Sequence, residues 1–426
     1  MSNVGVQILR ARVVVPVSRT AVENGAVVVA GGSIQALGKW KDLAPHLAGT
    51  PRDLGEVALL PGLVNAHCHL DYTDMAGQIA PPASFTDWIK SLVALKSAWG
   101  YSEFAQSWLN GARMLLRTGT TTVGDIEAVP ALLPEVWGAT PLRVVSFIEV
   151  LGVKRNRRPA DMLAEAVGRV ADLPAGRSRL ALSPHAPYST TSELLRRASE
   201  LARARGWRLC THIAESAEEY AMFKTAAGEM FSWLARSERD MADCDGMSPV
   251  GHLERTGLLT ENLLGVHLNY LDPGDAELLA RRGVSVVHCP RSHAYFRHRS
   301  FPMPSLVRAG VNLCLGTDSL VTTLKVGARP LQLDLFAELR AWHSTWVNAA
   351  PERALRLVTV NAARALGLAG RAGEIAVDAF ADLITVPFAG SPKIVYETIT
   401  HRTGPVAASM IGGEWVIPPG GDVDHV

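Results

Sequence analysis

Short apolar runs alternate with longer amphipathic segments through most of the chain. Each run ends at a polar cluster, which is typical of buried parallel strands. The longer segments repeat apolar residues at spacings of three and four, as in 101–117, 192–205 and 275–282, and this period predicts helices. Strands are predicted at 63–66, 120–124, 142–148, 180–183, 208–212, 264–268, 284–288 and 311–316.

Eight strands separated by helices favour an α/β fold, the (β/α)8 or TIM barrel. A doubly wound open sheet is the alternative, but no GxGxxG sequence follows the first strand. After the eighth strand, 351–368 predicts one helix that ends at Gly367 or Gly370. We therefore expect residues 59–369 to form the barrel.

Both ends of the chain are rich in strand patterns. Candidates are 6–15, a hairpin over 25–37 that turns at Gly31-Gly32, and strands at 382–386, 406–411 and 414–417. We expect residues 1–58 and 370–426 to fold together as one small, discontinuous β-sandwich domain.

The longest insert in the predicted barrel is 216–262, after the fifth strand. It carries an apolar stripe with Met222, Phe223 and Trp233, followed by a polar stretch. A helix that covers the barrel and a lid or wall over the substrate are both compatible with this pattern, because loops after barrel strands surround the active site.

Composition and charge exclude several classes of function. Lys and Arg number 42 against 41 Asp and Glu, so there is no basic footprint for nucleic acid. No apolar run is long enough to cross a membrane, and the N-terminus lacks a signal-peptide core. The five cysteines are scattered, and four of them lie in or after apolar runs, which predicts buried free thiols and a cytoplasmic protein. The sequence as a whole leaves open whether copies of the chain form a homo-oligomer.

Candidate chemistry begins with His67 and His69, at the end of the first barrel strand. Side chains alternate faces along a strand, so both imidazoles project to one side and Cys68 to the other. Such a pair can hold a divalent metal. Two partly buried histidines bonded to the backbone are the alternative explanation.

Further polar residues follow other strands of the predicted barrel. Strand five leads into His212 and Glu215, strand six into His267, and strand eight into Asp318. A core histidine, a first-turn carboxylate and a helix N-cap would explain these residues one at a time. Their shared position at strand ends favours one active site, because residues there point into the mouth of a barrel.

These residue types suit hydrolysis assisted by a metal. Three neutral imidazoles and one carboxylate bind a 2+ ion and leave room for water, whose pKa the ion lowers toward about 7. Glu215, three residues beyond His212, is placed to shuttle protons. His267 is a candidate for polarising the substrate or stabilising the attacking hydroxide. Zinc is the preferred ion, and ferrous iron accepts the same ligands.

Long motifs of the chain resemble the amidohydrolase superfamily, in the branch of cytosine deaminases, guanine deaminases and chlorotriazine hydrolases. The resemblance implies one metal ion held by His67, His69, His212 and Asp318, with Glu215 as proton shuttle and His267 as a catalytic residue outside the ligand set. No lysine stands at the end of strand four, which favours a single-metal site. The matching motifs are PGLVNAHCHLDYTDMAGQI, LLRTGTTTVGD, SPHAPYS, THIAES, VHLNYLDPGDAELLARRGVSVVHCPRSH, LVRAGVNLCLGTDS and GEIAVDAFADLITV.

The resemblance also points to residues that would contact substrate. His185 is similar to the substrate-facing histidine of adenosine-derivative deaminases, and Asp87 stands where relatives often carry a Glu that contacts ribose hydroxyls. Trp88 is placed to stack on a heterocycle, with core packing as the alternative. Arg143 is a candidate for a substrate carboxylate, with a surface ion pair as the alternative. His293 replaces a common Asn beside the pocket.

The expected activity is hydrolytic deamination of an amino-substituted, nitrogen-containing ring. A 5′-modified adenosine such as aminodeoxyfutalosine is the first candidate, on the strength of His185 and Asp87. Removal of halide or alkylamine from a triazine and opening of a cyclic amide keep the same metal site. A catalytically silent scaffold of the same fold is the alternative outside enzymes.

Overall fold

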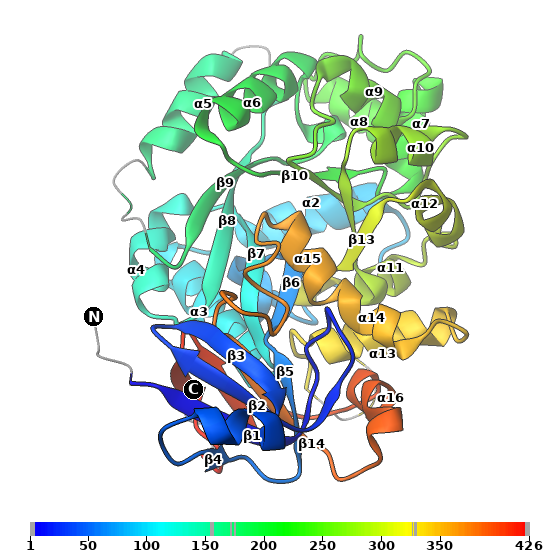
Figure 1. The fold of residues 1–426 in the computed structure, drawn as a ribbon. Helices are drawn as coiled ribbons and strands as arrows, with labels where there is room; N and C mark the ends of the chain where they lie inside the picture. The colour runs from blue at the N-terminus through cyan, green and yellow to red at the C-terminus, as the bar shows by residue number, and fades with distance from the viewer. Residues whose placement is uncertain are drawn as a thin grey trace.

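The fold is that of a computed structural model, which describes residues 5–153, 157–170, 173, 176–325, 327 and 330–421. A barrel occupies the centre of the molecule and a smaller sheet lies at one end (Figure 1). The blue and red segments of the ribbon, from the two ends of the chain, meet in that smaller sheet.

The barrel is built from eight parallel strands in chain order, β6 to β13. Each predicted strand is present, so the predicted barrel is confirmed. The strands are β6 (Leu63–Cys68), β7 (Thr120–Glu127), β8 (Arg143–Val150), β9 (Arg179–Pro184), β10 (Leu209–Ile213), β11 (Leu263–His267), β12 (Ser285–His288) and β13 (Asn312–Leu315).

The seam between β13 and β6 closes the barrel next to the polar strand ends. The backbone amide of Thr317 donates to the carbonyl of His67 at 3.0 Å, and Asp318 forms a parallel bridge with Cys68. Gly316 makes this approach possible, since a Cβ there would lie 2.7 Å from the His67 carbonyl oxygen. Asn65 fastens the same seam by donating to the Thr317 hydroxyl at 2.8 Å.

Segments from both ends of the chain form the second sheet, as expected. Its order is β16-β15-β14-β5-β1-β2-β3, with β4 paired to β1. The predicted domain boundary at residue 58 falls inside β5, and only Gly62 separates β5 from β6. The strands are β1 (Gln7–Val14), β2 (Val22–Ala30), β3 (Ser33–Lys39), β4 (Arg52–Asp53), β5 (Val57–Pro61), β14 (Leu383–Pro387), β15 (Ala408–Ile411) and β16 (Glu414–Ile417).

Helices surround the barrel, and those predicted over 101–117 and 192–205 have these same bounds. The helices are α1 (Trp40–Leu43), α2 (Phe85–Lys96), α3 (Tyr101–Arg117), α4 (Leu133–Gly138), α5 (Pro159–Gly168), α6 (Ser192–Arg205), α7 (Ala217–Thr225), α8 (Glu229–Arg236), α9 (Pro249–Thr256), α10 (Asp275–Arg281), α11 (Pro290–Phe296), α12 (Met303–Ala309), α13 (Leu335–Thr345), α14 (Pro351–Leu357), α15 (Val360–Ala365) and α16 (Val395–Thr400).

The prediction of one helix over 351–368 is wrong. Two short helices, α14 and α15, occupy this stretch, and Thr359 between them has φ −138° and ψ −106°. The break turns the carbonyl of Val358 toward β6, where it accepts from the amide of Val64 at 2.8 Å. A bond to the barrel therefore replaces continuation of the helix.

The insert over 216–262 folds as α7, α8 and α9 and packs on the loop after β9. Arg239 is 3% exposed and donates to the carbonyls of Tyr188 and Pro187 at 2.9 and 3.0 Å. Its guanidinium is paired with Asp243 at 2.7 Å. Trp233 of α8 lines a cavity beside the barrel mouth, so the insert both covers the barrel and forms a wall.

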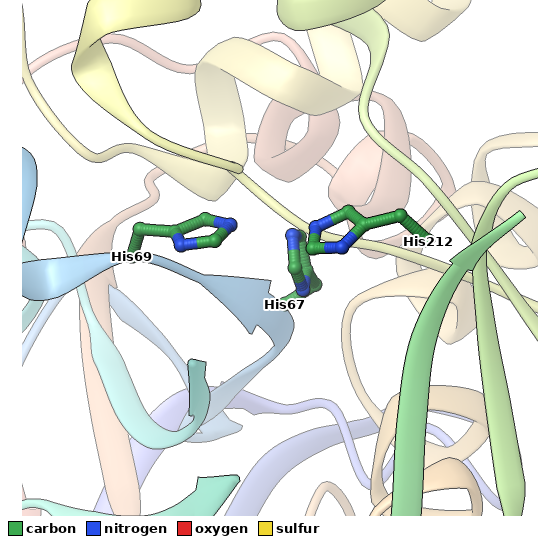
Figure 2. A group of neighbouring side chains, drawn as sticks. All are labelled: His67, His69 and His212. Carbon is green, nitrogen blue, oxygen red and sulfur yellow. The ribbon is translucent and has the colours of Figure 1, made fainter. Parts of the chain in front are cut away.

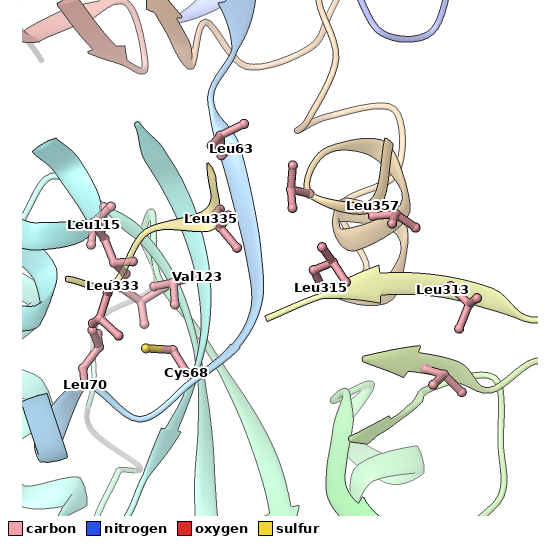
Figure 3. Close-up of a cluster of buried hydrophobic side chains, with 14 of the residues drawn as sticks. Leu63, Cys68, Leu70, Leu115, Val123, Leu313, Leu315, Leu333, Leu335 and Leu357 are labelled. Carbon is pink, nitrogen blue, oxygen red and sulfur yellow. The ribbon is translucent and has the colours of Figure 1, made fainter. Parts of the chain in front are cut away.

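The main core lies between the barrel strands and the surrounding helices. Figure 3 shows Cys68 in this layer, near Leu70 and Val123, on the face of β6 that turns away from the barrel axis. All five cysteines are buried and free, as predicted. Within the described part of the chain, no helix combines the length and hydropathy needed to cross a bilayer.

Candidate active site

Three histidines meet at the carboxyl ends of β6 and β10. His67 lies within β6, His69 directly follows it, and His212 comes from β10. Figure 2 shows the three rings gathered between the two strands. The centroids of the His67 ring and the His69 and His212 rings are 4.9 and 5.0 Å apart, and one nitrogen from each ring lies within 4.8 Å of the others. Alternation along β6 therefore places His67 and His69 on one face, as predicted.

Glu215, His267 and Asp318 form a second buried group beside the histidines. An Oε1 atom of Glu215 lies 3.4 Å from Nε2 of His267. An Oδ1 atom of Asp318 lies 3.6 Å from Nε2 of both His67 and His69. The structure thus brings together all six residues that the sequence placed at strand ends.

The backbone is strained where these side chains emerge. His267, Leu268 and Asp318 have φ values of 75°, 50° and 54°, in the left-handed region that side chains other than glycine rarely adopt. Such conformations cost about 1–3 kcal/mol each and persist where surrounding structure enforces them. The amide of Leu268, for instance, donates to the carbonyl of Ile213 at 2.8 Å. These backbone conformations turn the Asp318 carboxylate and the His267 imidazole into the barrel mouth.

Electrostatics favour the neutral forms of His69 and His212 and the ionised form of Asp318. Burial, with the neighbouring His67, lowers the pKa of His212 to about 4 and that of His69 well below its usual value. Burial alone would raise the pKa of Asp318, but the adjacent rings of His67, His267 and His69 outweigh burial and hold that pKa well below its usual range. Neutral imidazole and ionised carboxylate are the forms that bind metals.

The hydrogen-bond pattern fits a divalent cation. Both ring nitrogens of His67 and the Nδ1 atom of His69 are buried and have no hydrogen-bond partner among the residues that the structure describes. The Nδ1 atom of His212 lies 2.9 Å from the carbonyl of His185, an arrangement that leaves Nε2 free for a ligand. Burying a ring nitrogen without a bonding partner costs free energy. A 2+ ion bound by the three rings and Asp318 would offset that cost.

Five of the six residues, all except His67, border a cavity of about 130 Å³ at the mouth of the barrel. His185 and Trp88, both predicted substrate contacts, line this cavity. The Nδ1 atom of His185 lies 2.6 Å from the Ser189 hydroxyl, which fixes the ring beside His212. Apolar lining comes mainly from α2 and includes Phe85, Trp88, Ile89, Leu92 and Val93.

Three predicted substrate contacts lie elsewhere. The Asp87 side chain is 59% exposed on the outer face of α2 and pairs with Lys90 at 2.9 Å. Arg143 begins β8 at the opposite end of the barrel, where its guanidinium pairs with Asp382 of the small sheet at 2.5 Å. His293 bonds to the side chain of Asn269 at 3.0 Å, outside the cavity. The structure therefore brings neither Asp87 nor Arg143 to the site.

Three residues absent from the sequence prediction line the same cavity: Tyr72, Lys96 and Glu149. Lys96 lies on the apolar stripe of α2, at a helical spacing from Ile89 and Leu92, whereas Asp87 is nine residues away and so on the opposite face. A charged residue on that stripe is the signal that could have identified Lys96. Tyr72 and Glu149 gave no comparable signal.

A second, outer cavity of about 360 Å³ adjoins the first. The two share Ile89, Val93 and Leu151 in their lining, and His185 lies between them. The outer cavity is mostly apolar. Arg157, the charged residue among its described lining residues, is paired with Glu165 at 2.6 Å. The inner site therefore opens into a chamber suited to an apolar group.

Comparison with known proteins relates this geometry to one family. The Amidohydrolase family matches residues 58–416. The 5-methylthioadenosine/S-adenosylhomocysteine deaminase of Syntrophobacter fumaroxidans is 32% identical over 417 residues, which cover 93% of this chain and 88% of the relative. The aminodeoxyfutalosine deaminase of Deinococcus radiodurans is 30% identical over 308 residues, which cover 70% and 72% of the two chains.

Solved structures share the whole architecture. An adenosine deaminase from Xanthomonas campestris with bound zinc superposes with a TM-score of 0.82 and 26% identity. The match covers 97% of this chain and 93% of that structure. The barrel and the small sheet therefore have the same relative arrangement in a zinc-containing relative.

Proposed function

The chain belongs to the amidohydrolase family, and we propose that it is a metal-dependent deaminase of 5′-modified adenosine derivatives. One observation carries the proposal: two of the metal-fitting histidines, His69 and His212, border a small cavity together with Glu215 and His267, and this cavity opens into an apolar chamber. The names of the relatives, which include 5′-modified adenosines, support the same substrate class.

His67, His69, His212 and Asp318 would hold the metal ion, with zinc preferred because a 26% identical relative contains it. Bound there, a divalent ion lowers the pKa of water from 15.7 toward about 7 and so supplies a nucleophile at neutral pH. One molecule of water is consumed, the ring carbon gains an oxygen atom, and the amine leaves as ammonia.

Glu215 performs the proton transfers. Burial and the charge of Asp318 raise the pKa of this carboxyl well above its usual value, which suits exchange of protons near neutral pH. It takes one proton from the attacking water and delivers it to the ring nitrogen. It then carries the second proton of that water, from the new hydroxyl on the ring carbon, to the departing amine. His267, 3.4 Å from Glu215, holds the attacking oxygen in place.

The two cavities orient the substrate. The ring lies in the inner cavity against Trp88 and Phe85, whose own rings stack with centroids 5.8 Å apart. His185 lies at the junction of the cavities and faces the non-reacting edge of the substrate. The 5′ substituent extends into the outer chamber, past Leu151 and toward Trp233.

An ammonia-release screen of zinc-loaded protein against 5′-modified adenosines, guanine, cytosine and triazines tests the proposal. We expect turnover of the adenosines, and a Glu215→Gln variant should lose about 10²–10⁴-fold in kcat because it cannot accept a proton. Its zinc content, measured by elemental analysis, should stay at the wild-type level. Glu277→Gln, on the exposed surface of α10, is the matched control and should keep full activity.

Other outcomes of the screen would overturn the proposal. Chloride release from a chlorotriazine without ammonia release from any adenosine would assign a different leaving group. Protein that binds no zinc would favour a silent scaffold. Full activity in Glu215→Gln would remove this residue from the proton transfers.

A further inference from the structure

A lysine ammonium group faces the inner cavity from the last residue of α2. Lys96 donates a hydrogen bond to the hydroxyl of Tyr72, and its Nζ atom lies 4.3 Å from the centre of the Tyr72 ring. Lys96 is half-buried, and an ammonium in that setting needs other groups to solvate its charge. None of the proton transfers described above uses this ammonium.

A carboxylate faces the same cavity from β8. The side chain of Glu149 is 4% exposed, and its Oε1 atom lies 3.9 Å from Nε2 of His185. Both Lys96 and Glu149 line the inner cavity, yet within the described part of the chain they form no ion pair with each other. Each charge therefore keeps hydrogen-bonding capacity for a molecule in the cavity.

The surroundings of Lys96 are acidic. Asp71 is fully buried, and within the described ranges of the chain neither of its carboxylate oxygens has a hydrogen-bond partner. Burial raises the pKa of Asp71 and of Glu149, and the nearby Lys96 ammonium counteracts both rises, so these two acids already compete for the ammonium. Lys96 is therefore better suited to donate to a neutral oxygen than to attract a substrate carboxylate.

We propose that Lys96 and Glu149 bind the vicinal hydroxyl groups of the substrate sugar and make this enzyme selective for ribonucleosides. An ammonium is a pure donor and a carboxylate a pure acceptor, whereas a hydroxyl does both, so two adjacent hydroxyls satisfy the pair. Apolar residues of α2 form the adjoining wall. The inference rests on the proposed function, and it assigns to these two residues the contact that the sequence assigned to Asp87.

Deamination of adenosine, 2′-deoxyadenosine and 3′-deoxyadenosine by the zinc-loaded enzyme tests the inference. The measured quantity is the ratio of kcat/KM for the ribonucleoside to that for each deoxy analogue. This ratio does not depend on the fraction of protein that is correctly folded. Wild-type enzyme should prefer adenosine by at least about tenfold to a hundredfold, the range expected for a hydrogen bond to a charged group.

Glu149→Gln and Lys96→Met should each reduce the preference about tenfold or more for at least one analogue. Asp87→Asn is the matched control, since its side chain lies on the opposite face of α2, and it should keep the wild-type ratio. Two variants at separate elements keep the test decisive if one of them folds poorly.

Wild-type ratios near one, or unchanged ratios in both Glu149→Gln and Lys96→Met, would overturn the inference and leave the deaminase assignment intact. A lost preference in Asp87→Asn alone would return the sugar contact to that residue. Absence of ammonia release from every adenine nucleoside would instead refute the proposed function, and with it this inference.

Discussion

Asn65 offers no ligand atom to the site, yet it joins two of the strand ends that do. Its side-chain carbonyl accepts from the amides of His67 and Thr317 at 3.3 and 3.2 Å, and its amide group donates to the Thr317 hydroxyl. Asn65 is completely buried, so water cannot replace these bonds. One amide side chain thus fixes the distance between the His67 and Asp318 segments.

Asn65→Ala should weaken zinc binding by about 10–100-fold, as is usual when residues that orient ligands are removed. The free energy of unfolding should fall by about 1–3 kcal/mol, because the buried amides of His67 and Thr317 lose their partner. Competition with a chelator and urea denaturation measure the two effects. Asn348→Ala, at an exposed turn, is the control and should change neither zinc affinity nor stability. Unaltered zinc affinity in Asn65→Ala would show that the seam does not position the ligands.

Residues at strand ends were predictable because alternation along a strand and the geometry of a barrel act locally. His67, His69 and Asp318 lie where those rules place them. Lys96 and Glu149 escaped prediction because their role depends on α2 lying across the barrel mouth, a packing choice that no local pattern specifies. Asp87 was misplaced for the same reason, since the buried face of α2 is the one opposite to it.

Among the elements, β13 and β6 are joined at their carboxyl ends by a contact that only glycine permits. A Cβ on Gly316 would meet the carbonyl oxygen, Cβ and amide nitrogen of His67 at 2.7–3.0 Å. The backbone cannot yield there without moving a metal-fitting histidine. The contact that closes the barrel therefore also sets the position of His67 in the site.

Gly316→Ala should lower the free energy of unfolding by about 1–3 kcal/mol through overpacking, and zinc content should fall with it. Gly138→Ala, at the end of α4, is the matched control, because a Cβ there meets no atom within 4 Å. Thermal denaturation and elemental analysis report both effects. Wild-type stability and zinc content in Gly316→Ala would mean that the seam tolerates a wider spacing.

Helices and strands were predicted well where one amphipathic period runs through them, as in α3 and α6. The stretch 351–368 shows the limit of that rule. Its pattern is continuous, but a carbonyl at Val358 bonds to β6 rather than to the next helical turn. Tertiary hydrogen bonding outweighed local propensity there, and the sequence carries no glycine or proline at the break to announce it.

At the scale of the whole molecule, one buried ion pair ties the barrel to the small sheet. Two guanidinium nitrogens of Arg143 donate to the carboxylate of Asp382, at 2.5 and 3.2 Å. The same carboxylate also accepts from the amide of Gly412 at 2.7 Å. This pair lies at the end of β8 opposite to the active site. It joins residues that the sequence assigned to different domains.

Arg143→Met should cost about 3–5 kcal/mol of stability, because Asp382 stays buried without its cation. The kcat/KM of folded enzyme should not change, since Arg143 lies outside the cavity. Urea denaturation and steady-state kinetics separate the two effects. Arg143→Met combined with Asp382→Asn should recover part of the loss, because a neutral amide still accepts from Gly412. A raised KM with intact stability would restore Arg143 as a substrate contact.

The position of β5 has a consequence for synthesis of the chain. Leu59 of β5 pairs with Thr385 of β14, which the ribosome makes more than 300 residues later. At about 5–20 residues per second, one edge of the apolar β5 strand waits tens of seconds for its neighbour. Exposed strand edges recruit other chains, so the nascent protein is most prone to aggregation in this interval. Slower translation or loss of the last fifty residues should therefore lower the soluble yield, even though the active site lies entirely within the barrel.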